Sequence, residues 1–133
     1  MKNFKSIFAF SFLVLGLSIA NFSCKKDSIV HQTQLYIGGF QLSGSQVVYP
    51  LNFELHDDGT LVAFNNPADL TVPSGSGTYI IFNSLFVAEV TYTLEPGKKF
   101  SFLADCTSTQ FINGTWGTSP SKINGGTWTM TKQ

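Results

Sequence analysis

The chain contains the triplet Gly-Thr-Trp twice near its C-terminal end, as NGTWG at 113–117 and GGTWT at 125–129. Around each copy apolar and polar residues alternate, which is the pattern of a β-strand with one buried face. If the two segments form a hairpin with Trp116 opposite Trp128, both rings lie on one face as cross-strand neighbours. We therefore predict adjacent strands that bury both Trp side chains, and the functional alternative is a Trp platform on which a sugar stacks. Two further apolar residues would share this face, Ile112 and Met130.

Strand-like segments continue through the rest of the chain from residue 34 onward. They are rich in Val, Ile, Thr, Tyr and Phe, and Gly, Pro, Asn and Asp separate them at regular intervals. Consecutive strands with short connections favour an all-β, eight-stranded antiparallel up-and-down barrel, and a β-sandwich is the alternative. The predicted strands are 34–42, 48–56, 60–65, 76–82, 85–94, 98–105, 109–118 and 125–132.

Two turns allow the register of their hairpins to be predicted. With Asp58-Gly59 as a two-residue turn, Leu55 lies opposite Val62 and Phe53 lies opposite Phe64. In this register Asn52, Glu54 and His56 face away from the core. With Glu95-Pro96-Gly97 as a three-residue loop, Tyr92 lies opposite Phe100 and Val90 lies opposite Phe102.

The segment YIIFNSLFVAEV at 79–90 is apolar on both faces of its predicted hairpin. With Asn83-Ser84 as the turn, one face carries Tyr79, Ile81, Phe86 and Ala88. The outer face then carries Ile80, Phe82, Leu85 and Val87, where a barrel should be polar. We predict that this face contacts a second copy or another envelope protein. The alternative is a longer loop that folds Phe82 and Leu85 over the barrel end.

The N-terminal residues differ in kind from the rest. Lys2 and Lys5 precede an apolar run at 7–20, which is the pattern of an export signal over 1–23. The stretch ANFSCKKDS at 20–28 resembles the lipobox of bacterial lipoproteins, although Asn21 stands where that family prefers Leu. The resemblance implies lipidation of Cys24, a tether over 24–33 and anchoring in the outer membrane. It also implies that Lys25 does not retain the protein in the inner membrane. The alternative is cleavage after Ala20, which would permit a disulfide between Cys24 and Cys106.

The domain over 34–133 resembles small lipocalin-like β-barrel lipoproteins of Gram-negative bacteria, through GGTWTMTK at 125–132 and the order of the strands. The Gly-x-Trp of classical lipocalins is replaced by YIGGF at 36–40, and no helix follows the last strand. The resemblance implies a barrel that holds a small apolar ligand. The residues expected to face that ligand are Trp116, Trp128, Tyr92, Phe53, Phe102 and Met130.

Few residues suggest catalysis or a cofactor. Beyond Cys24 the chain has six lysines, eight acidic residues and no arginine, which disfavours nucleic acid as a partner. Two histidines, 31 and 56, do not form a cluster with metal-ligand spacing, and Glu54 and Glu89 read as acids of an exposed strand face. We expect no metal, no cofactor and no catalytic site. The prediction is a lipid-anchored binding or surface-display domain, with protein interaction or inhibition through the 79–90 face as the alternative. A small enzyme using His56 or Cys106 at a barrel mouth is the least favoured class.

Overall fold

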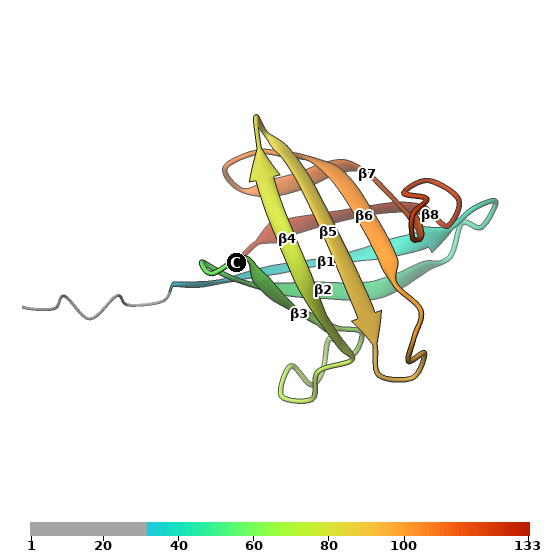
Figure 1. The fold of residues 1–133 in the computed structure, drawn as a ribbon, viewed down its shortest axis with the longest axis horizontal. Helices are drawn as coiled ribbons and strands as arrows, with labels where there is room; N and C mark the ends of the chain where they lie inside the picture. The colour runs from blue at the N-terminus through green and yellow to red at the C-terminus, as the bar shows by residue number, and fades with distance from the viewer. Residues whose placement is uncertain (1–31) are drawn as a thin grey trace, which may run out of the picture.

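The computed structural model describes residues 32–133 (Figure 1). The predicted signal peptide over 1–23, Cys24 and nearly all of the predicted tether lie outside the described residues. Within the described range, no helix is long and apolar enough to cross a membrane. The strands are β1 (Thr33–Leu42), β2 (Val48–His56), β3 (Thr60–Phe64), β4 (Gly75–Phe82), β5 (Leu85–Tyr92), β6 (Phe100–Cys106), β7 (Gln110–Thr118) and β8 (Gly126–Lys132).

The eight strands form a closed barrel in chain order, and each pairs antiparallel with its neighbours. Closure comes from β1, which pairs with β2 on one side and with β8 on the other. The predicted eight-stranded up-and-down barrel is therefore confirmed, and the chain does not form the alternative β-sandwich. Closure leaves no sheet edge with unpaired backbone groups.

The barrel has two different ends (Figure 1). At one end the chain enters β1 and leaves β8, and the turns 57–59, 83–84 and 107–109 are short. At the other end the connections are longer, and they cover 43–47, 65–74, 93–99 and 119–125. We call the first the closed end and the second the open end.

Aromatic side chains fill the interior toward the closed end. The Phe86 ring lies 4.3 Å from the Phe111 ring and 5.7 Å from that of Trp128, measured between centroids. Phe53, Phe86 and Phe111 are fully buried. An eight-stranded barrel has an interior that side chains can fill, and here they fill most of it.

The hairpin of β4 and β5 has the predicted register. Tyr79 lies opposite Ala88, and Phe82 lies opposite Leu85. Asn83 and Ser84 both have positive φ, 49° and 62°, as a two-residue type I′ turn requires. The short turn is thus confirmed, and the longer-loop alternative is wrong.

The predicted register of β2 and β3 is wrong by one residue. Leu55 lies opposite Leu61, and Phe53 lies opposite Ala63. The cause is a three-residue loop in which Gly59 has φ +84° and donates its N–H to His56 O at 3.1 Å. Val62 and Phe64 consequently lie on the outer face.

The outer face of β2 is less solvated than predicted. Asn52 lies there opposite Phe64, and both side chains are buried. The Asn52 side-chain oxygen accepts the Gly38 N–H at 3.4 Å, whereas its amide nitrogen has no partner. The prediction that Asn52 faces away from the core is compatible with the register, but the side chain does not reach solvent.

The register of β5 and β6 differs from the prediction by two residues. Val90 lies opposite Phe100, and Ala88 lies opposite Phe102. Because side chains alternate with period two, an even shift leaves the predicted faces unchanged. It lengthens the connection to 93–99, which brings additional side chains to the open end.

The two Gly-Thr-Trp triplets lie side by side, but the two Trp residues are not opposite each other. Thr115 lies opposite Thr127, so Trp116 faces Gly126 and Trp128 faces Gly114. A Cβ on Gly114 would lie 2.8 Å from two ring atoms of Trp128. The Gly of the first triplet thus leaves room for the ring of Trp128, whereas the room beside the ring of Trp116 comes from Gly125, which precedes the second triplet.

The prediction that Ile112 shares the Trp face is also wrong. The pairing of β7 with β8 shifts between Phe111 and Gly114, and Asn113 has a positive φ of 52°. This irregularity places Phe111 opposite Met130 and buries it completely. Ile112 is only partly buried.

Candidate functional site: an aromatic pocket at the open end

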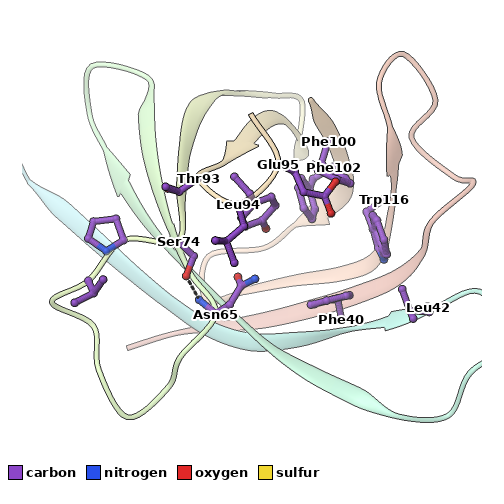
Figure 2. A pocket seen from close by; sticks show the side chains of 13 residues that line it. Phe40, Leu42, Asn65, Ser74, Thr93, Leu94, Glu95, Phe100, Phe102 and Trp116 are labelled. Carbon is purple, nitrogen blue, oxygen red and sulfur yellow. Dashed lines mark hydrogen bonds between the residues drawn. The ribbon is translucent and has the colours of Figure 1, made fainter. Parts of the chain in front are cut away.

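A pocket of about 610 Å³ opens at the mouth of the barrel, between the loops of the open end. Pockets of this size hold a small organic molecule. Figure 2 shows Trp116 on one side of it, Ser74 on the other and Leu94 between them. The lining residues are Phe40, Leu42, Asn65, Val72, Pro73, Ser74, Tyr92, Thr93, Leu94, Glu95, Phe100, Phe102 and Trp116.

Aromatic rings held edge to face form the wall of the pocket. The Phe40 and Trp116 rings lie 5.4 Å apart at 86°, and those of Tyr92 and Phe100 lie 5.5 Å apart at 69°. The Trp116 indole N–H donates to Gln41 O at 3.1 Å, which fixes the ring against β1. An apolar molecule would meet a wall whose rings already have partners that orient them.

Phe102 forms the boundary between the pocket and the core. Its ring stacks with that of Trp116 at 6.4 Å on the pocket side. On the core side it meets Phe53 at 5.3 Å and Trp128 at 5.8 Å. The pocket is therefore a hollow above a filled core and does not extend through the barrel.

The six residues predicted to face a ligand divide into two groups of three. Tyr92, Phe102 and Trp116 line the pocket. The other three are buried in the core and do not line it: Phe53, Trp128 and Met130. The strand faces were correct for all six, but depth along the barrel separates them.

Several residues of the pocket wall give no clear signal in the sequence. Phe40 alternates correctly in β1, yet it follows Gly38 and Gly39, which obscure the apolar pattern of that strand. Val72 and Ser74 lie in a connection, where periodicity gives no signal, and Leu94 lies beyond the end of β5 although the predicted strand 85–94 included it. Exposed apolar residues in two long loops of one barrel end were the available clue.

The polar groups of the pocket carry little net charge. Glu95 is the only carboxyl group among residues 32–133 that lines it, and its Oε2 lies 2.9 Å from Lys98 Nζ. Burial raises the pKa of the Tyr92 hydroxyl well above its ordinary value of 10.0, so this group is a neutral donor at physiological pH. Asn65 donates its backbone N–H to Ser74 Oγ at 3.0 Å, which ties the loop 65–74 to the mouth.

His56 and Cys106, the residues of the least favoured enzyme class, lie at the closed end, away from this pocket. His56 Nε2 is 3.2 Å from Glu54 Oε1, and the backbone oxygen of His56 accepts the Tyr79 hydroxyl at 2.7 Å. Burial raises the pKa of the Cys106 thiol, which disfavours the nucleophilic thiolate. No group of three or more metal-ligating side chains occurs among residues 32–133.

The outer face of the 79–90 hairpin is apolar and exposed, as its register requires. Ile80 and Phe82 are exposed by 64% and 70%. Leu85 is also exposed, whereas Val87 is partly buried.

The chain was compared with models of protein families, with curated proteins and with solved structures, and none of them matches it.

Proposed function

We propose that this chain is a lipid-anchored envelope protein without enzymatic activity that binds a small, uncharged apolar ligand at the open end of its barrel. The observation that carries the proposal is the aromatic pocket of about 610 Å³ above a filled core. Anchoring through Cys24 rests on the lipobox resemblance. It suits the fold, because the chain enters β1 at the closed end and an anchor there leaves the mouth accessible.

The absence of charge in the ligand follows from the chemistry of the wall. Within the part of the chain that the structure describes, no lysine or histidine lines the pocket, and Lys98, which lies outside it, contacts Glu95. A carboxylate moved into such a site would lose water without gaining a cation, which is unfavourable. A hydroxyl or carbonyl group could instead pair with the neutral Tyr92 hydroxyl, which has no hydrogen bond to another described residue.

The test is quenching of intrinsic fluorescence by a brominated long-chain alcohol and by the brominated fatty acid of equal length. The full chain is produced in an exporting bacterium and held in nanodiscs, because detergent would compete for the pocket. We expect the alcohol to quench the protein and to bind about tenfold more tightly than the acid, since one missing ion partner is worth at least one factor of ten. Trp116→Phe, which keeps an aromatic side chain in the wall, should lose most of the quenching.

Quenching that is unchanged in Trp116→Phe would place the probe outside the pocket and contradict the proposed site. Equal affinity for both probes would contradict only the uncharged ligand class.

Anchoring has a separate readout, which is the mass of the N-terminal peptide. We expect acyl groups on Cys24 and none in Cys24→Ser, and an unmodified N-terminus beginning at Asn21 would contradict the anchor.

A second candidate function is protein contact through the outer face of the 79–90 hairpin, favoured by the exposure of Ile80 and Phe82. Ile80→Thr combined with Val87→Thr keeps β-branched side chains and should preserve the barrel. If this face joins two copies, light scattering should show the loss of a dimer. Unchanged assembly and solubility of the double variant would rule the contact out.

A further inference from the structure

Exposed apolar side chains gather on the loops of the open end. Each of the four connections there carries one, and these are Val47, Val72, Leu94 and Ile123. Leu94 is exposed by 94% and Ile123 by 72%. At the closed end all three turns consist of polar residues and Gly, and only the turn at 83–84 has exposed apolar neighbours, Phe82 and Leu85. The apolar rim thus surrounds the mouth of the pocket.

Lysines also lie at the open end, whereas the turns of the closed end are acidic. The open-end loops carry three lysines, Lys98, Lys99 and Lys122, and two acids, Asp69 and Glu95. The turns of the closed end carry Asp57 and Asp58 and no lysine. Lys98 contacts Glu95 at 2.9 Å and Lys99 contacts Glu89 at 3.6 Å, so the positive excess at the rim is small. Apolar contacts would therefore contribute more than charge to any association of this end.

The form of this surface fits a lipid interface better than a folded protein. Four separate loops each present an apolar tip, and between the tips lies the opening of the pocket instead of a continuous patch. A bilayer interface accepts isolated apolar tips while its headgroups and water hydrate the loop backbone around them. Lysines beside such tips lie at headgroup level, where anionic lipids attract them.

We propose that the open end docks, through Val47, Val72, Leu94 and Ile123, on the surface of a lipid bilayer other than the one that holds the anchor at the closed end. The aromatic pocket then opens directly onto the acyl layer, and an apolar ligand passes between membrane and pocket without crossing water. The ligand step rests on the proposed function, whereas docking is a property of the rim and is measured without ligand.

The experiment mixes the full chain, held in nanodiscs, with sucrose-loaded vesicles of phosphatidylcholine and phosphatidylglycerol, and measures the chain that sediments with the vesicles. Empty nanodiscs give the background. The test variant is Val47→Ser with Ile123→Ser, two rim positions that do not line the pocket. The matched control is Ile80→Ser with Phe82→Ser, which removes apolar side chains of similar exposure from the hairpin face. All four positions are exposed, so we expect both variants to fold.

We expect the rim variant to lower the bound fraction about tenfold, since two exposed apolar side chains lose their burial in lipid, and the hairpin variant to bind as the parent does. Salt should weaken binding only modestly, because few charges take part. Docking is overturned if the parent sediments no more than empty nanodiscs, or if the hairpin variant loses as much binding as the rim variant. Quenching by the brominated alcohol, measured in the same samples, shows separately whether the pocket binds.

Discussion

The two Gly-Thr-Trp triplets have the same residues, similar strands and adjacent positions, yet their Trp side chains have different surroundings. Trp128 is buried in the core, where its indole N–H donates to Thr115 O at 2.9 Å. Trp116 is partly exposed and lines the pocket. Depth along the barrel, and not the local motif, therefore separates a ring that packs in the core from one that lines the pocket.

The antiparallel pairing produces this difference in depth. Trp116 lies opposite Gly126 at the start of β8, whereas Trp128 lies opposite Gly114, two residues further from the open end. Two residues of a strand span about 6.6 Å, which is one layer of side chains inside the barrel. Identical triplets therefore place their rings in successive layers, one sealed and one open.

The largest expected effect distinguishes the two Trp residues by stability. Trp128→Ala should lower the free energy of unfolding by about 3–5 kcal/mol, because it leaves a cavity in the core. Trp116→Ala should cost about 1–2 kcal/mol, since that ring already borders an empty pocket. Chemical denaturation followed by near-ultraviolet circular dichroism measures both values. Equal losses would show that the two rings share one core, and Trp128→Phe serves if the alanine variant does not fold.

A smaller effect concerns the glycines beside the two rings. A Cβ on Gly114 would lie 2.3 Å from the Trp128 backbone oxygen, which the paired strands hold in place. A Cβ on Gly125 would lie 2.4 Å from Cε3 of Trp116, a ring that borders the pocket and can yield toward it by lengthening its 3.1 Å hydrogen bond to Gln41 O. We expect Gly114→Ala to cost about 1–3 kcal/mol and Gly125→Ala to cost less than about 1 kcal/mol. The reverse order in thermal melts would mean that the pocket wall is the more rigid region.

The smallest effect is a dependence on alkaline pH. The raised pKa of the Tyr92 hydroxyl means that the unfolded chain releases this proton near pH 10.0 while the folded chain retains it. The contribution to stability is therefore complete below pH 10 and is lost as the pH rises above it, by at most about 1.4 kcal/mol per pH unit. Tyr92→Phe should reduce this alkaline slope, and part of it should remain because burial also raises the pKa values of Tyr36 and Tyr79. An unchanged slope would indicate that water reaches Tyr92 in the mouth.

Where the sequence predicted register, its success depended on the turn. The two-residue turn predicted at Asn83-Ser84 was correct, because two residues of positive φ leave little choice of loop length. The two-residue turn predicted at Asp58-Gly59 was wrong, because Gly can also supply the left-handed last position of a three-residue loop. The β5–β6 and β7–β8 hairpins were wrong by two residues. Such a shift keeps the side chains of β5 and β6, and those of β7 from Gly114 onward, on their predicted faces, so alternation cannot detect it. Ile112 leaves the Trp face because of the irregularity between Phe111 and Gly114.

The division of the predicted ligand-facing residues has a related cause. Alternation reports which face of a strand a side chain occupies, and all six of those residues face inward. It does not report how deep in the barrel a residue lies, because depth depends on how the strands are staggered around a closed sheet. Phe53 and Tyr92 could therefore not be separated before the structure was known.

The sequence by itself determined the all-β class, the number of strands, their approximate bounds and the inward face of most of them. These follow from alternation and turn chemistry, which act between residues close in the chain. Only the tertiary structure decided which rings fill the core, which line the pocket and which loops share the open end. Those properties depend on register, stagger and closure between β1 and β8, which are interactions between residues far apart in the chain.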